Sequence, residues 1–371
     1  MLTLTPALLR ALRMRSLLLS GAAPATPVDI VTWFGAMQAQ DVASGMWSLG
    51  VRLPDWTELD VRASLERAEI LRTWPMRGTI HLVPSQDAVW MLELTGSRAL
   101  TGSLGRRTEL GLDLADAERA TRALEDALGG GHRLTRAQAL TAINDAGIST
   151  DGQRGYHLLW YAAQVGATCI GPQVGREQTF VLLRDWAPRQ RSLGRDDALV
   201  ELAFRYFRSH GPATVNDFAG WTGLTLNDAR TGLAGNSGRL VPARLGSDTL
   251  WLSSDVADAP DGRALSRRVL ALPGFDEFML GYKDRTGHLP HGGMERVVPG
   301  GNGVFRATLV AGGAVIGTWR RTLVGAKVRI TVEPFSPLTD RARGSATRAL
   351  TAYADYLGRE GDIRFAEPVD G

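Results

Sequence analysis

Cysteine and lysine are scarce in this chain, and each shortage excludes a class of protein. Cys169 is the only cysteine among 371 residues. A single cysteine excludes an intramolecular disulfide and a cysteine-based zinc site, and it fits the reducing cytoplasm. Only two of the 42 basic residues are lysines, Lys283 and Lys327. The abundant arginine suits contacts with phosphates and base edges, although a codon bias would produce the same excess.

Long apolar runs and phosphate-binding glycine motifs are also missing. No stretch reaches the ~18 apolar residues of a membrane span, and a helix that begins with Thr5 and Pro6 explains the leucine-rich start. The 43 glycines form neither a Walker loop nor a Rossmann fingerprint, which argues against nucleotide-driven activity. With 44% hydrophobic and 22% charged residues, the chain has the composition of a folded protein of several modules.

The first third of the chain has the pattern of a winged helix, a small helical domain that ends in a β-hairpin. Apolar residues recur with helical spacing, interrupted by one extended stretch. Within that stretch, residues 70–74 and 79–83 alternate like strands around a tight turn at residues 75–78. The helices are predicted at residues 5–19, 27–37, 57–67 and 85–95.

A similar order of helices and hairpin recurs twice. Thr135 and Thr214 mark equivalent helix starts, because each is a threonine N-cap that follows an extended residue. The helices predicted in these repeats cover residues 136–146, 152–165, 196–210 and 214–221, with one more that starts at 225. The hairpins pair residues 169–171 with 179–182 and residues 240–243 with 249–252. We therefore expect three tandem winged-helix domains, over residues 1–112, 113–190 and 191–256.

The sequence pattern changes in the last third of the chain. Short apolar runs bounded by glycine, proline and asparagine are typical of strands. Strands are predicted at residues 304–310, 314–320 and 327–332, and a long helix at residues 339–358. The complete prediction is an α/β (α+β) chain in which three winged helices precede a C-terminal β-barrel-like domain over residues 263–371.

The most informative short segment contains two glutamines, Gln38 and Gln40. On a continuous helix their side chains point about 200° apart, so they converge only if the helix ends there. Asp41 and the serine and glycine that follow it argue for such an end. Spacing alone favours the plainer interpretation of a polar helix terminus. Asp41 is either a rival general base or a residue of the turn.

Five segments, read together, carry a pattern that extends over most of the chain. They are residues 37–41 (Met-Gln-Ala-Gln-Asp), 72–81, 272–285, 302–305 and 317–321. In this order they resemble the signatures of AlkZ/YcaQ-type winged-helix DNA glycosylases. The resemblance implies three winged helices and a β-barrel around a channel for double-stranded DNA. It also implies that Gln38 and Gln40 form the family's catalytic Gln-apolar-Gln motif, which supports hydrolysis of the N-glycosidic bond of N7-alkylated purines.

Glutamine rather than aspartate at position 40 resembles the branch of the family that unhooks interstrand crosslinks, in DNA repair or in the self-resistance of a genotoxin producer. The chemistry of such a substrate fits two neutral amides. Alkylation at N7 makes the purine cationic, so it leaves as a neutral base without a general acid. The amide oxygens of Gln38 and Gln40 can hold the attacking water and stabilise the oxocarbenium-like sugar. Since no lysine lies near Gln38 in the sequence, we expect a monofunctional hydrolase with no cofactor.

Six further residues are predicted to contact DNA. Two lie on or beside the first hairpin, where the alternative is an exposed turn and a packed imidazole. The other four lie in a cationic, glycine-flanked loop at residues 282–293. The six are Arg77, His81, Lys283, Arg285, His288 and His291. The His-x-x-His spacing within the loop is also that of a metal pair, but its carboxylate neighbours are generic, so we expect DNA contact and no metal.

A non-catalytic function is the alternative. Winged helices also occur in DNA-binding proteins and transcriptional regulators, in which the two glutamines would only end a helix. Release of a base from alkylated or crosslinked DNA separates the two functions. Under either function, we expect a cytoplasmic monomer that binds double-stranded DNA and does not bind a membrane.

Overall fold

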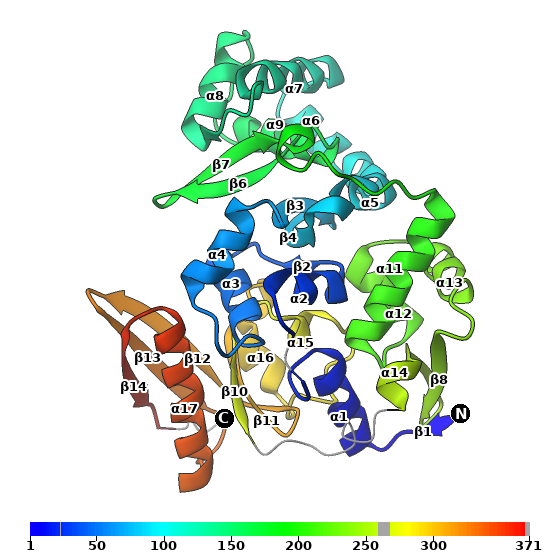
Figure 1. Ribbon diagram of the computed structural model, residues 1–371, viewed down its shortest axis with the longest axis vertical. Coiled ribbons are helices and arrows are strands. Elements are labelled where there is room, and N and C mark those ends of the chain that lie inside the picture. Colours follow the sequence, from blue (N-terminus) through cyan, green and yellow to red (C-terminus); the bar gives the residue numbers. More distant parts are fainter. Residues whose placement is uncertain (23, 259–267, 368–371) are drawn as a thin grey trace. The chain divides into compact units, whose positions relative to one another are not determined.

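The computed structural model describes residues 1–22, 24–258 and 268–367, which fold into two compact units (Figure 1). The first unit contains Met1–Val61, Val200–Trp221 and Leu226–Gly371. The second contains Arg62–Leu199 and Thr222–Thr225. Each unit is built from segments that lie far apart in the sequence. No helix in the described part of the chain combines the length and the hydropathy that crossing a bilayer requires.

Polar N-caps set the starts of the first helices. Thr5 accepts a hydrogen bond from the Leu8 amide at 3.2 Å, and Pro6 takes the first helical position. Thr26 forms a capping box with Asp29. The helices of this stretch are α1 (Pro6–Ser16), α2 (Pro27–Phe34), α3 (Val42–Gly50) and α4 (Glu58–Glu66). The helices predicted at 5–19, 27–37 and 57–67 are confirmed, whereas α3 lies outside the predicted helices.

The N-terminus packs on a hairpin that is distant in sequence. Strands β8 (Leu240–Leu245) and β9 (Asp248–Ser253) pair as predicted, and β1 (Leu2–Thr3) adds to β8 in parallel. A small apolar core lies beneath, which includes Leu9 and Leu12 of α1. The helices before and after this hairpin are α11 (Arg195–His210), α12 (Val215–Thr222), α13 (Leu226–Ala234) and α14 (Ser254–Ala257). The first and third predicted repeats therefore share one core.

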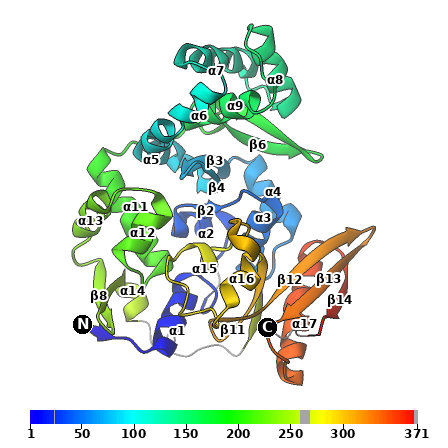
Figure 2. The ribbon, with the colours of Figure 1, turned by 180° about the vertical axis from the view of Figure 1, so that it is seen from behind.

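The C-terminal strands form an open five-stranded sheet, half of a barrel. Its order is β10-β11-β12-β13-β14, and every pairing is antiparallel except β13 with β14. The strands are β10 (Val269–Leu272), β11 (Ala307–Ala311), β12 (Ala314–Val324), β13 (Lys327–Pro334) and β14 (Glu360–Phe365). Helix α17 (Asp340–Tyr356) contacts both edge strands, β10 and β14, and lies beside the sheet in both views (Figure 1, Figure 2). The helix takes the place that further strands would fill in a closed barrel.

The second unit joins two predicted hairpins into one sheet. Its strands run in the order β4-β3-β6-β7-β5, and β3 meets β6 where Arg72 lies opposite Ile170. The strands are β3 (Ile70–Met76), β4 (Thr79–Pro84), β5 (Leu134–Thr135), β6 (Thr168–Val174) and β7 (Glu177–Leu182). The helices around them include α5 (Ala88–Gly102), α7 (Leu114–Leu128), α8 (Arg136–Asp145) and α9 (Arg154–Gln164). Sequence analysis missed α7, although Asp113 and Asp116 form the capping box that marks its start.

Candidate active site

The glutamine pair lies on an extended segment and not at a helix end. Helix α2 stops at Phe34 because Gly35 adopts a left-handed φ of 83°, and the two-residue strand β2 (Met37–Gln38) follows. Burial then alternates, as it does along a strand. Met37 and Ala39 are 0% and 1% exposed, whereas Gln38 is half-buried and Gln40 is exposed. Both glutamine side chains therefore face away from the core. They do so because the segment is extended, and not because a helix ends there, as the spacing had suggested.

The middle of this segment packs against the backbone of α3. A Cβ atom on Gly45 would lie 2.7 Å from the Cβ of Ala39, so only glycine permits this approach. Asp41 starts α3, since its Oδ1 accepts a hydrogen bond from the Ser44 amide at 2.8 Å. Of the two interpretations of Asp41, the turn residue matches this geometry, and a role as general base stays a hypothesis.

A buried carboxylate accepts a hydrogen bond from the backbone of the same segment, on the side that faces the core. Glu277, the first residue of α15 (Glu277–Leu280), is 1% exposed. Its Oε1 accepts a hydrogen bond from the backbone amide of Gln38 at 2.9 Å. Its Oε2 lies 3.2 Å from Nε2 of His210 and 2.9 Å from Nε1 of Trp221. Burial raises the pKa of Glu277, but the hydrogen bonds and charge of His210 and the two other donors outweigh it and lower the pKa to about 2.

The preceding residue, Asp276, makes a separate buried cluster. Its carboxylate accepts hydrogen bonds from both terminal nitrogens of Arg52, at 2.8 and 3.1 Å, and from Ser48 at 2.6 Å. Arg52 also donates to the carbonyl of Leu17. Both acids lie within the family signature at residues 272–285, but no role was predicted for either of them. Two adjacent carboxylates inside an apolar run are the signal that was available, because buried acids require partners.

The predicted DNA-binding loop of the first unit is only partly exposed. Lys283 and His291 are exposed, and Arg285 is half-buried. His288 is 2% exposed, between the rings of Phe278 and Tyr282. Burial and nearby arginines lower the pKa of His288 to about 3, and its Nε2 has no hydrogen-bond partner among the described residues. A DNA contact by His288 therefore requires a rearrangement of the loop.

The two histidines of this loop differ in burial, and the metal interpretation receives no support from their surroundings. In the described ranges, no three histidine, cysteine or carboxylate side chains gather as a metal site requires.

Arg77 and His81 lie in the second unit, whereas both glutamines lie in the first. Arg77 is exposed and has a φ of 53°, and Gly78 follows with a φ of 67°, so the two residues form the tight turn between β3 and β4. His81 is fully buried, and its Nδ1 lies 2.9 Å from the carbonyl oxygen of Thr79. These positions are an exposed turn and a packed imidazole, and DNA contact by either residue stays a prediction.

Comparison with known proteins identifies the family. A family model described as DNA glycosylase AlkZ-like matches residues 31–356. The chain belongs to this family.

Two relatives from Streptomyces sahachiroi extend the comparison. A protein named interstrand DNA cross-link repair glycosylase is 24% identical over 310 residues, which are 78% of this chain and 81% of that protein. The solved structure of Streptomyces sahachiroi DNA glycosylase AlkZ superposes with a TM-score of 0.80 at 20% identity. The superposition covers 98% of this chain and all of that one. The structural likeness establishes a shared fold.

A cavity of about 220 Å³ begins beside the glutamine segment of this AlkZ-like chain. Asp41 and Ser44 form one wall, and arginine and aromatic side chains form the others. The lining includes Trp47, Phe275, Phe305, Trp319, Arg320, Arg321 and Tyr353. Phe275 has a left-handed φ of 62°, a backbone strain of the kind that clusters at functional sites. Trp47 lines this cavity and also packs in the core, where its indole donates a hydrogen bond to the carbonyl of Ala271 at 2.7 Å.

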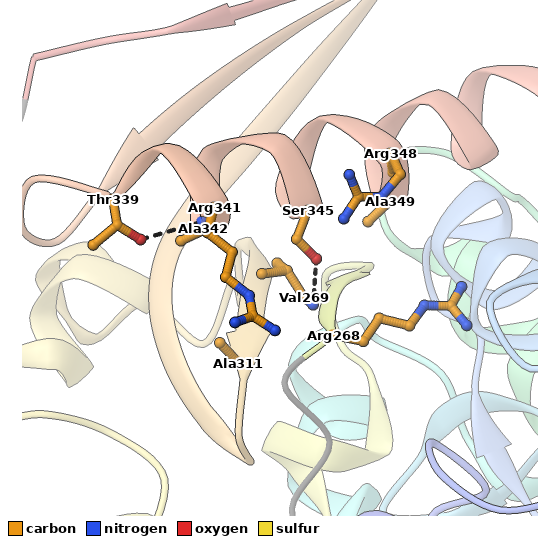
Figure 3. Close-up of a pocket in the computed structure, with 9 residues that line it drawn as sticks. All are labelled: Arg268, Val269, Ala311, Thr339, Arg341, Ala342, Ser345, Arg348 and Ala349. Carbon is orange, nitrogen blue, oxygen red and sulfur yellow. Dashed lines mark hydrogen bonds between the residues drawn. The ribbon is translucent and has the colours of Figure 1, made fainter.

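A second cavity, of about 640 Å³, lies beneath α17 (Figure 3). Arg268, Arg341 and Arg348 line it, and Ser345 of α17, which also lines it, accepts a hydrogen bond from the Val269 amide at 3.0 Å. Three guanidinium groups give it the charge that attracts anions. None of the predicted site residues lines it.

Proposed function

We propose that this AlkZ-like chain is a monofunctional DNA glycosylase that hydrolyses the N-glycosidic bond of N7-alkylated purines, including those in interstrand crosslinks. The main support for this proposal is the alternation of burial along residues 37–40. The side chains of Met37 and Ala39 are buried in the core, and the two amide side chains between and after them face outward. The family match covers this segment, and a relative of 24% identity is named an interstrand cross-link repair glycosylase.

The proposed reaction requires little acid–base chemistry. Water adds its oxygen to C1′ of the sugar while the bond from C1′ to N9 breaks, and the electron pair of that bond neutralises the cationic base. The attacking water gives its proton to solvent. Gln38 and Gln40 orient the water with their amide oxygens and present partial negative charge to the sugar cation. An unmodified purine would leave as an anion, so selectivity for cationic lesions follows.

The lysines give the chain little means for a Schiff-base mechanism. Lys327 pairs with Glu360 at 2.8 Å, on the sheet. The stem of Lys283 lies across Gly220, where an added Cβ would meet the Lys283 side chain at 2.7 Å. Neither lysine lines the cavity beside the glutamine segment, and hydrolysis by water is therefore the mechanism that we propose.

We extend the proposal to binding of double-stranded DNA by a cytoplasmic monomer, through three winged helices over residues 1–112, 113–190 and 191–256. Arg77, Lys283 and His291 are the predicted DNA-binding residues whose side chains are exposed, as a contact with phosphate requires. Arg285 is half-buried and His81 and His288 are buried, so their contacts would follow a change of conformation.

One assay tests the proposal against a non-catalytic DNA-binding protein. A duplex with a single N7-methylguanine, or a defined interstrand crosslink, is incubated with the protein, and abasic sites or separated strands are measured. We expect release by the wild type and a rate at least about 100-fold lower for the Gln38→Ala, Gln40→Ala double variant. Binding without release would favour the regulator, and full activity in the double variant would reject the assigned pair.

A further inference from the structure

The elements behind Gln38 converge on one carboxylate. Glu277 begins α15, His210 ends α11, and Trp221 lies near the end of α12. All three side chains are at most 2% exposed. The Gln38 amide is the only backbone donor among the three groups that the carboxylate contacts. Three helices of the first unit thus meet at the backbone of one residue of the motif.

His210 is itself held on every side. Its Nδ1 lies 2.8 Å from Oγ of Ser209, and Tyr206 stacks on the imidazole with ring centroids 4.6 Å apart. A Cβ on Gly281 would lie 2.3 Å from Cδ2 of His210, so glycine is required for α15 to approach this closely. Because a carboxylate accepts but does not donate, Nε2 of His210 carries the hydrogen toward Glu277. The orientation of the carboxylate is therefore fixed before any substrate binds.

A buried carboxylate at this position is unfavourable if its only function is to stabilise the fold. Burying an ionised group costs several kcal/mol of desolvation, which its partners compensate only in part, and an apolar residue of similar size often stabilises a protein as well or better. Strongly perturbed acids are instead concentrated where an enzyme fixes its reacting groups. The Gln38 amide would be satisfied by a neutral acceptor, but a charged acceptor gives a shorter and stronger bond.

We propose that Glu277 is a positioning residue of the active site, which acts through the Gln38 backbone amide and is itself oriented by His210 and Trp221. It sets the direction of β2, so that the Gln38 side chain presents its amide to the reacting sugar and water. Glu277 does not contact the substrate, because it lies wholly behind the segment. This inference rests on the proposed glycosylase function.

The test compares two buried substitutions. Glu277→Gln removes the charge and presents an NH₂ group to at least one of the three donors. Thr121→Val is the matched control, since it deletes a buried hydroxyl that donates to the Ala117 carbonyl at 2.8 Å within α7 of the second unit, outside the Glu277 cluster. Single-turnover release of N7-methylguanine is measured over a range of enzyme concentrations. We expect Glu277→Gln to lower the saturating rate about tenfold or more, with half-saturation within about twofold of wild type. Thr121→Val keeps the saturating rate.

A spectroscopic readout separates positioning from general stability. In protein labelled with ¹⁵N-glutamine, the Gln38 amide proton should resonate downfield in wild type and in Thr121→Val, and move upfield in Glu277→Gln. If Glu277→Gln does not fold, Glu277→Asp replaces it: the charge stays, but the carboxylate recedes from the amide by one methylene. The same fall in saturating rate and upfield shift are then expected.

The outcomes are distinct. A wild type that releases no base overturns the proposed function. An active wild type overturns the inference alone if Glu277→Gln keeps its rate within about twofold, or if Thr121→Val loses as much as Glu277→Gln.

Discussion

Asp276 and Glu277 are adjacent in sequence and each is 1% exposed, yet they belong to different clusters. Asp276 accepts hydrogen bonds from Ser48, in the last turn of α3, and from Arg52, two residues beyond that helix. Arg52 also donates a hydrogen bond to the carbonyl of Leu17. Glu277 faces the backbone of Gln38 and two aromatic donors. The first cluster ties helices to one another, and the second ties helices to the glutamine motif. Adjacent buried acids can therefore serve the fold and the site separately.

The pH dependence of the second cluster follows from the pKa of Glu277. The lowered pKa of Glu277, about 2 against an ordinary 4.5, means that its contribution to stability is complete above pH 4.5. That contribution is lost only as the pH falls toward 2. Glu277 is thus ionised at every pH at which the reaction would be measured.

The largest effect on stability is expected from Asp276→Asn. Removing one partner of a buried ion pair leaves the Arg52 guanidinium uncompensated, which costs about 3–5 kcal/mol. Equilibrium unfolding in urea measures the loss. The control is Glu69→Gln, because the Arg67–Glu69 pair is also held by two hydrogen bonds, both 2.9 Å long, but its side chains are 52% and 38% exposed, so its loss should cost far less. Under conditions where the variant is folded, its base-release rate should match wild type; a fall as large as that of Glu277→Gln would erase the distinction between the clusters.

His288 provides the next test, since it is a buried titratable group without the partners that both acids possess. Its pKa is about 3 in the folded protein against an ordinary 6.5, so between these values the unfolded chain binds a proton that the folded chain rejects. Stability should therefore fall as pH drops from 6.5 toward 3, by up to about 1.4 kcal/mol per pH unit. His288→Leu should remove this slope and gain about 2 kcal/mol relative to wild type at pH 5.

Urea unfolding at pH 7 and pH 5 measures the effect. His291→Leu, in the same loop but exposed, should leave the acid slope unchanged. An unaltered slope in His288→Leu would show that other groups control the acid stability.

Much of the fold could be predicted from local sequence. Three helices begin after a threonine whose side chain accepts a hydrogen bond from the backbone amide three residues later, namely Thr5, Thr26 and Thr135. The hairpins could be predicted from alternating apolar residues on both sides of short turns. Long-range pairing could not be predicted in this way. Nothing local shows that β1 joins β8, or that β3 joins β6 in one sheet.

The candidate site divides in the same manner. Gln38 and Gln40 were found in the sequence through resemblance, but the reason they share a side was not, because it depends on Gly35 ending α2 early. Glu277 and His210 are 67 residues apart and meet only in the folded chain. Their residue types were visible in the sequence, whereas their partnership is a property of the tertiary structure.

A matched pair of serines tests the two clusters with the same chemical change. Ser48 donates to Asp276 at 2.6 Å, and Ser209 lies 2.8 Å from the ring of His210. Ser48→Ala and Ser209→Ala should each cost about 1–3 kcal/mol in urea unfolding, because each removes a buried hydroxyl that makes more than one hydrogen bond. Only Ser209→Ala should also lower the single-turnover rate, by a few fold. Equal rates in the two variants would indicate that the orientation of His210 does not reach Gln38.

The smallest effect on stability is expected at Arg77, the exposed counterpart of the buried Arg52. Arg77→Asn removes the charge, and asparagine tolerates the left-handed backbone of this turn better than arginine does, so stability should stay within about 0.5 kcal/mol. If Arg77 contacts a phosphate, the slope of log affinity against log salt concentration becomes shallower by about 0.9, because one fewer counterion is released on binding DNA. Arg77→Lys, which keeps the charge, should retain the wild-type slope. A slope that is equal in all three proteins would mean that Arg77 contacts no phosphate when DNA binds.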